Sequence, residues 1–233
     1  MATSPLSPPI GLLVSGGLDS GILLGHLLAA GRTVQPFYVR GSLRWEPAEL
    51  ATLRLLLAAL ARPGLAELVV LDMPVADLYR DHWSVTGRGV PDETTPDEAV
   101  FLPGRNALVI LKPALWCQMH GIEELALAPL VTNPFPDATA TFFDLFERTL
   151  SQAAQPPDGV ARPLRIVRPF GHLHKREVMQ LGRSLPLELT FSCIDPVAGA
   201  QGEASLHCGR CNKCAERKAA FKDAGLDDPT RYA

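Results

Sequence analysis

Residues 10–30 read IGLLVSGGLDSGILLGHLLAA, and this stretch decides the fold. The run Ile10 to Val14 is short, continuous and apolar, as expected for a strand that is buried in a parallel sheet. Two glycines follow within two residues. Ser20 to Ala30 then carries apolar residues at helical spacing and stops at Gly31, a frequent helix terminator. The stretch therefore predicts a buried strand, a tight turn and a helix.

The same alternation continues along the chain. Further strands are predicted over Val34 to Val39, Leu65 to Leu71, Glu124 to Val131 and Arg165 to Pro169. Helices are predicted over Pro47 to Ala61, Asn106 to His120 with a kink at Pro113, Ala138 to Ala153, and Lys175 to Ser184. The polar, Gly- and Pro-rich stretch from His82 to Asp97 is expected to be a long loop. Alternating strands and helices predict an α/β fold with a five-stranded, doubly wound parallel sheet. Such sheets bind ligands beyond the carboxyl ends of their strands, where residues 15–20 lie.

Composition narrows the class of protein. The chain has 233 residues, of which 47% are hydrophobic and 20% charged, as in ordinary globular proteins. A net charge of −3 gives no general basic field, so neither a nucleic-acid nor a membrane partner is expected. The first nine residues lack the pattern of a secretion signal, and no apolar run approaches the ~18 residues of a membrane span. We therefore expect a cytoplasmic protein.

The loop Ser15-Gly16-Gly17-Leu18-Asp19-Ser20 has the residue types that hold phosphate. Its glycines let the backbone turn and bring N–H groups against a phosphate, and the following helix adds its positive N-terminal end. The two serines supply hydroxyl donors, and Asp19 can orient Mg²⁺. The alternative is a simple strand-to-helix turn with Ser20 as the helix cap. The loop lacks the lysine of a Walker motif, and it resembles the signature of N-type ATP pyrophosphatases, which split ATP between the α- and β-phosphates.

Four of the five cysteines lie in the last quarter of the chain, as Cys193, Cys208, Cys211 and Cys214. Such spacing, without a secretion signal, favours metal ligation over disulfides. Four thiolates suit a closed tetrahedral Zn²⁺ site, and an iron–sulfur cluster is the alternative. Arg210 and Lys213 are expected to ease the gathering of negative sulfurs. The remaining Cys117 is expected to be a buried core thiol, and His207 is not expected to be a ligand.

Three motifs together resemble one known family. They are residues 15–20, Leu102-Pro103-Gly104-Arg105-Asn106, and Ser192-Cys193 with Cys208-Gly209-Arg210-Cys211-Asn212-Lys213-Cys214. The chain resembles the 7-cyano-7-deazaguanine synthases of queuosine biosynthesis over nearly its whole length. The resemblance implies an adenine-nucleotide α-hydrolase-like fold with a small zinc-stabilised C-terminal lobe, which divides the chain into 1–185 and 186–233. It also implies a ligase that uses ammonia and two ATP to turn a carboxylate into a nitrile, and a possible homodimer.

The resemblance assigns roles to particular residues. Arg105 and Lys175 would contact phosphates, beside Asp19; a solvated lysine on the helix face is the alternative for Lys175. The segment from Thr132 to Phe143 departs from the family pattern, and within it Asn133, Phe135 and Asp137 are the candidates for holding a deazapurine. The altered segment leaves other functions open. These are a relative that uses a different carboxylate or amine, a tRNA-modifying enzyme, and a nucleotide sensor without turnover.

Overall fold

The computed structural model describes residues 8–154, 164–200 and 203–233. Residues 1–7, which make up most of the stretch inspected for a targeting signal, lie outside this description. Among the described residues, no helix has both the length and the apolar character needed to cross a membrane.

Five strands form one sheet in the order β3-β2-β1-β4-β5, and every pairing is parallel. The strands are β1 (Ile10–Leu13), β2 (Val34–Arg40), β3 (Val69–Asp72), β4 (Glu124–Ala126) and β5 (Arg165–Val167). β1 pairs with β2 on one side and with β4 on the other. The chain therefore adds strands first on one side of β1 and then on the other, and the strand order reverses at β1. Ligands of such sheets bind in the crevice at this reversal, beyond the carboxyl ends of the strands.

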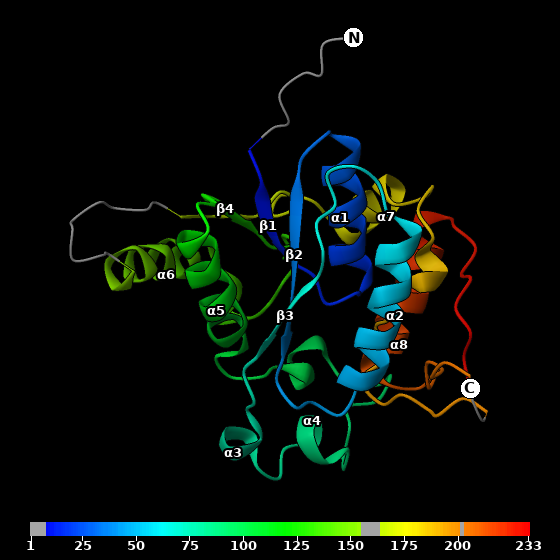
Figure 1. The fold of residues 1–233 in the computed structure, drawn as a ribbon. Coiled ribbons are helices and arrows are strands. Elements are labelled where there is room, and N and C mark those ends of the chain that lie inside the picture. The colour runs from blue at the N-terminus through cyan, green and yellow to red at the C-terminus, as the bar shows by residue number, and fades with distance from the viewer. Residues whose placement is uncertain (1–7, 155–163, 201–202) are drawn as a thin grey trace.

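Helices cover both faces of the sheet (Figure 1). One face carries α1 (Leu18–Ala29), α2 (Glu46–Ala59), α7 (Lys175–Leu181) and α8 (Asn212–Ala224), and the other carries α5 (Arg105–Met119) and α6 (Ala140–Ala153). The short helices α3 (Ala76–Tyr79) and α4 (Trp83–Thr86) lie beyond the carboxyl ends of the strands. Three 3₁₀ turns complete the elements, at Asp97–Val100, Pro136–Ala138 and Leu187–Leu189.

Side chains along β1 point alternately to the two faces of the sheet, so this strand contributes to the core on both faces. Leu12 belongs to the core under α1 and α7, whereas Leu13 packs against the core under α5 and α6. Gly11 leaves room for α5, because a Cβ atom there would come within 2.7 Å of the Cys117 sulfur. Cys117 is fully buried, and burial raises its pKa to about 12, so the predicted core thiol is confirmed.

The predicted fold class is confirmed, and the differences concern ends of elements. Helix α1 begins two residues earlier than predicted, so half of the glycine-rich loop is its first turn. Strand β3 begins only at Val69, because Leu65 makes just an isolated bridge to Val34. Helix α5 continues through Pro113. The predicted long loop over residues 82–97 contains one short helix, α4, and its residues Pro91 and Glu93 make backbone hydrogen bonds to the cysteine segment.

The C-terminal helix α8 packs on the core beneath the sheet. Ala220, Phe221 and Ala224 of α8 belong to the same core cluster as β1 and α1. Phe191 N–H donates to the Gly16 carbonyl at 2.8 Å, which ties the segment around Phe191 to the glycine-rich loop. The predicted division of the chain after residue 185 stays a prediction.

Candidate active site

The glycine-rich loop links β1 to α1 and leaves the N-terminus of that helix open. Gly16 has φ +86°, and a Cβ atom there would meet Leu53 at 3.1 Å, so the turn requires glycine. Gly17 is the N-cap residue of α1, and no side chain caps the helix. The first N–H groups of a helix have no intrahelical partner, so they offer an anion-binding end. Ser15 Oγ accepts from Gly17 N–H at 3.3 Å and lies 3.2 Å from Ser20 Oγ.

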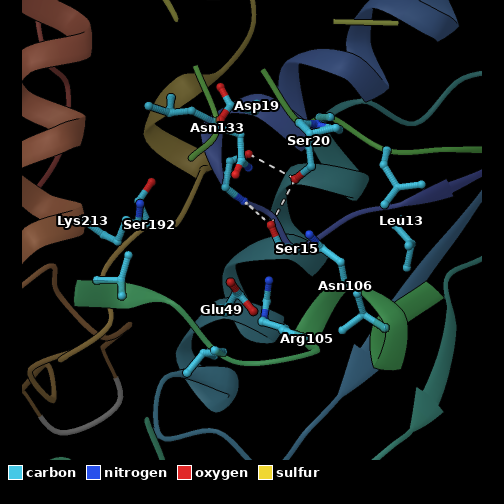
Figure 2. Close-up of a pocket in the computed structure, with 18 of the residues that line it drawn as sticks. Leu13, Ser15, Asp19, Ser20, Glu49, Arg105, Asn106, Asn133, Ser192 and Lys213 are labelled. Atoms are coloured by element: carbon cyan, nitrogen blue, oxygen red, sulfur yellow. Dashed lines mark hydrogen bonds between the residues drawn. The ribbon is translucent and has the colours of Figure 1, made fainter. Parts of the chain in front are cut away.

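A cavity of about 380 Å³ opens above this loop, at the carboxyl ends of β1, β2 and β4. Figure 2 shows side chains from separate parts of the chain converging on it. Every predicted site residue outside the cysteine cluster lines it, except Gly16: Ser15, Gly17, Leu18, Asp19, Ser20, Arg105, Asn133, Phe135, Asp137 and Lys175. Trp45, Trp83, Phe101 and Phe191 add aromatic walls. The cavity thus combines an anion-binding end with surfaces suited to planar rings.

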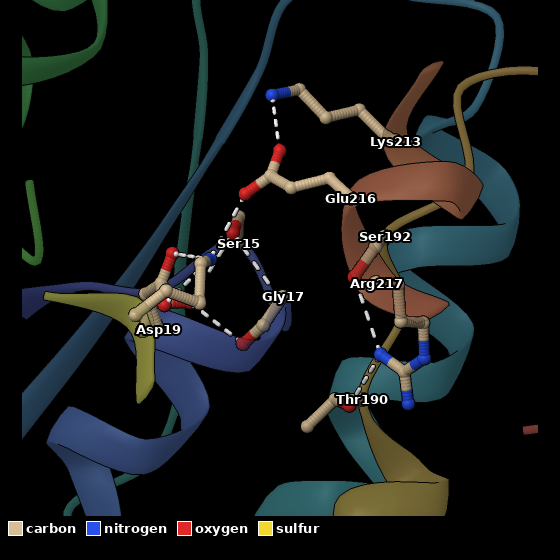
Figure 3. Close-up of polar contacts among 10 residues, drawn as sticks. Ser15, Gly17, Asp19, Thr190, Ser192, Lys213, Glu216 and Arg217 are labelled. Carbon is tan, nitrogen blue, oxygen red and sulfur yellow. Dashed lines mark hydrogen bonds and ion pairs between the residues drawn. The ribbon is translucent and has the colours of Figure 1, made fainter. Parts of the chain in front are cut away.

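Charged side chains meet at one side of the cavity (Figure 3). Lys175 Nζ lies 2.9 Å and 2.7 Å from the two carboxylate oxygens of Asp19, and 3.0 Å from Glu216. Glu216 also contacts Lys213 Nζ at 2.6 Å. Burial opposes the charge on Glu216, but the two lysines outweigh it and lower its pKa to about 2. Asp19 and Glu216 likewise raise the pKa of Lys175 against the effect of burial, so Lys175 and Glu216 are both charged.

A second acidic group lies beside Arg105. Glu49 on α2 is buried, and its Oε2 accepts from the Tyr38 hydroxyl at 2.7 Å. Burial raises the pKa of Glu49 to about 7, although the bond from Tyr38 and the charge of Arg105 act in the opposite direction. Within the described residues, the buried Nε of Arg105 has no hydrogen-bond partner. An arginine placed this way keeps donor capacity for a ligand in the cavity.

The segment that departs from the family pattern is fastened to α5. The Asp137 carboxylate accepts from the backbone N–H of Asn106 at 3.0 Å, and the Asn106 amide donates to the Asp137 carbonyl at 2.9 Å. Asn133 Oδ1 accepts from Phe135 N–H at 3.0 Å. The Phe135 ring lies 5.3 Å from that of Phe101. Asp137 therefore has a structural partner, whereas Phe135 presents part of its surface to the cavity.

The four clustered cysteines lie apart from the cavity and form one compact group. All four are buried, and their sulfurs lie within 4.8 Å of one another. Two sulfur pairs, Cys193–Cys211 and Cys208–Cys214, are 3.9 Å apart. Tetrahedral zinc with Zn–S bonds of ~2.3 Å requires sulfurs ~3.8 Å apart, so the group fits this ion.

Neighbouring backbone groups support the sulfurs. Cys208 N–H donates to the Cys193 sulfur at 3.2 Å, and Cys211 N–H to that of Cys208 at 3.3 Å. These bonds favour the thiolate form that a metal requires. His207 is not in the group, as predicted, because its Nε2 accepts from Ser192 N–H at 3.1 Å. Lys213 directs its charge to Glu216, a partner that sequence reasoning did not assign to it.

Three charged residues that line the cavity were not predicted from the sequence. Glu49 and Glu216 look like ordinary helix-surface residues in the sequence, and only the packing of α2 and α8 turns them inward. Arg217 is 1% exposed and donates to Thr190, Ser192 and the Leu187 carbonyl. A buried arginine on a polar helix leaves no periodic signal, so none of the three was predictable.

The sheet order and the Ser-Gly-Gly-Leu-Asp-Ser loop define a protein of the pyrophosphate-loop ATP-binding class. Within this class, the chain belongs to the family of the queuosine biosynthesis protein QueC, whose model matches residues 10–225. It is 31% identical over 227 residues to the 7-cyano-7-deazaguanine synthase of Thiobacillus denitrificans, covering 95% of this chain and 97% of that protein. The protein of the same name from Anaeromyxobacter dehalogenans is 29% identical over 230 residues, covering 95% and 94% of the two chains. A solved structure of a predicted tRNA methyltransferase subunit from Methanocaldococcus jannaschii is only distantly similar, with 13% identity and a TM-score of 0.45 over 76% of this chain and 75% of that one.

Proposed function

We propose that this chain adenylates the carboxylate of 7-carboxy-7-deazaguanine with ATP and, with ammonia, converts it to the nitrile 7-cyano-7-deazaguanine. One observation carries the proposal. The open N-terminus of α1, Asp19, Lys175 and Arg105 line the same cavity as the aromatic side chains. The family membership supports the same reaction, because the curated relatives are named for its product.

The reaction balances as two adenylations. In the first, a carboxylate oxygen attacks the α-phosphorus, pyrophosphate leaves, and ammonia then displaces AMP to give an amide. In the second, the amide oxygen attacks another ATP, pyrophosphate leaves, and loss of AMP and protons gives the nitrile. Each substrate oxygen departs in one AMP, which is a better leaving group than oxide. Holding both reactants in one cavity supplies the orientation that these steps need.

The chain's own residues divide the work in this scheme. The N-terminal end of α1, with Ser15 and Ser20, binds the pyrophosphate part of ATP. Arg105 and Lys175 offset charge on the phosphates as it develops. We propose Mg²⁺ as the counter-ion of the nucleotide, with Asp19 as its protein ligand, and Zn²⁺ in the thiolate group as a structural ion.

The test is an incubation of the protein with ATP, Mg²⁺, ammonia and 7-carboxy-7-deazaguanine. We expect AMP, pyrophosphate and the nitrile, with two AMP for each nitrile, measured by mass spectrometry. ADP as the nucleotide product would contradict the proposal. So would AMP formation that does not depend on this acid.

A second candidate function has its own support. Asp137, one of the three candidates for holding the deazapurine, is hydrogen-bonded to Asn106. The chain would then adenylate another carboxylate, or join the activated acid to an amine other than ammonia. In this case AMP forms with a different acid or amine, and a panel of planar aromatic acids and primary amines in the same assay separates the two functions.

A further inference from the structure

Four charged side chains are joined by successive ion pairs between the phosphate loop and the cysteine segment, and Figure 3 labels three of them, Asp19, Glu216 and Lys213. Their order is Asp19, Lys175, Glu216 and Lys213, with successive contacts of 2.7 Å, 3.0 Å and 2.6 Å. Two carboxylates and two ammonium groups cancel in charge. All four are only 23–33% exposed, so these contacts are less screened than those of a surface pair.

The first contact places Lys175 in competition with any cation that reaches Asp19. Lys175 Nζ bonds both oxygens of the Asp19 carboxylate, at 2.9 Å and 2.7 Å. Mg²⁺ is bound in proteins through one or two carboxylates together with substrate phosphates. For Asp19 to act as such a ligand, Lys175 has to move away from it.

Glu216 is the partner that can receive Lys175 when it moves. It already contacts Lys175 Nζ at 3.0 Å through its Oε1. Its second oxygen is held by Lys213, which lies between the clustered Cys211 and Cys214. Because Lys213 competes for the same carboxylate, it limits how strongly Glu216 attracts Lys175.

We propose that Glu216 is a positioning residue that draws Lys175 off Asp19, and so sets how strongly a divalent cation promotes nucleotide binding. This inference rests on the proposed function, since it takes the loop to be the nucleotide site. It assigns to α8 a part in the phosphate site as well as in the metal-binding lobe. A purely structural ion pair would stabilise the fold but would leave the cation dependence unchanged.

The test measures the Kd of α,β-methylene-ATP by calorimetry, once without added divalent cation and once in saturating Mg²⁺. Chelators are left out, so that the cysteine site is undisturbed. The readout is the Kd without divalent cation divided by the Kd in saturating Mg²⁺, and this ratio measures the coupling between cation and nucleotide. We expect Glu216→Gln to lower this ratio by about fivefold, the equivalent of a pair worth ~1 kcal/mol. Lys213→Met should raise the ratio, because Glu216 then attracts Lys175 alone.

Glu124→Gln is the matched control. Glu124 also bridges two cations, Arg32 and Arg165, but it does not line the cavity. We expect Glu124→Gln to leave the ratio unchanged. Unchanged metal content in all variants would show that the cysteine site is intact. An unchanged ratio in Glu216→Gln, or shifts of equal sign in the two cluster variants, would overturn the inference. If Glu216→Gln does not fold, Lys213→Met decides. A raised Kd ratio in that variant supports the inference, and an unchanged or lowered ratio overturns it.

The wild-type protein separates this inference from the proposed function. Absence of nucleotide binding under both conditions would contradict the proposed function itself. Binding that Mg²⁺ does not strengthen would leave the nucleotide site standing and overturn only the competition at Asp19.

Discussion

At the residue scale, two of the carboxylates that line the cavity, Asp19 and Glu49, have different surroundings. Asp19 is paired with Lys175 at the edge of the phosphate loop. Glu49 is buried against Tyr38 without a cation in salt-bridge contact among the described residues, and burial raises its pKa to about 7. Glu49 therefore changes charge near neutral pH.

Asp19→Asn should remove AMP formation while preserving the fold, because the amide keeps the shape but not the charge. We expect turnover to fall by about 10²-fold or more. The measurements are AMP release and the thermal unfolding midpoint. A variant that unfolds at the wild-type temperature and still forms AMP at the wild-type rate would disprove the role of this carboxylate.

Glu49→Gln should change the pH dependence of stability. A carboxyl group with a raised pKa contributes stability that is complete below its unfolded value of 4.5 and is lost as the pH rises through about 7. The wild type should therefore lose about 3 kcal/mol relative to the variant between about pH 5 and pH 8. Urea unfolding of both proteins at the two pH values checks this. Parallel pH profiles would mean that Glu49 titrates normally.

At the element scale, the glycine-rich loop depends on a backbone conformation that few residues adopt, and the cysteine segment depends on hydrogen bonds to a distant loop. Gly16 has φ +86° and packs on α2 through Leu53. Hydrogen bonds tie the cysteine segment to residues 91–96. The Asn212 N–H donates to the Pro91 carbonyl, and the Asn212 side-chain amide donates to the Thr95 carbonyl. Both elements therefore place active-site groups through contacts distant in sequence.

Gly16→Ala should weaken nucleotide binding and cost about 1–2 kcal/mol of stability, from its backbone conformation and the contact with Leu53. Gly31→Ala is the control, since Gly31 has φ +74° with open space around it and ends α1 far from the loop. We expect Gly31→Ala to cost stability but leave nucleotide affinity unchanged. Equal affinities in all three proteins would show that the loop does not depend on this turn.

Cys211→Ser should lose the bound metal and unfold or aggregate, because metal binding contributes directly to folding. Cys117→Ser is the control: it buries a hydroxyl at a cost of about 1–3 kcal/mol but keeps the metal. Elemental analysis and the visible spectrum give the metal content and distinguish zinc from an iron–sulfur cluster. A metal-free, stable Cys211→Ser protein would contradict a structural role.

Local patterns made the α/β fold and the phosphate loop predictable, because apolar runs, glycines and helix spacing encode them within a few residues. The cysteine group was predictable from spacing alone. Glu49, Glu216 and the capping of α5 by Asp137 were not, since each depends on how distant helices pack. The ends of β3 and β4 also escaped prediction, because pairing with neighbouring strands sets them.

At the scale of the whole molecule, the sheet places the anion-binding loop where the strand order reverses, at β1. One layer contributes the loop through α1, the other contributes Arg105 through α5, and the C-terminal helix α8 contributes Glu216. The cavity is thus completed only by the folded chain as a whole. The homodimer that the family resemblance implies stays a prediction.

The central claim is that this cavity transfers AMP from ATP to a carboxylate oxygen. The most direct measurement uses 7-carboxy-7-deazaguanine labelled with ¹⁸O in its carboxylate, followed by mass spectrometry of the AMP. We predict that both labelled oxygens leave in AMP, one in each of two molecules. Label retained in the product or released into water or inorganic phosphate would contradict it.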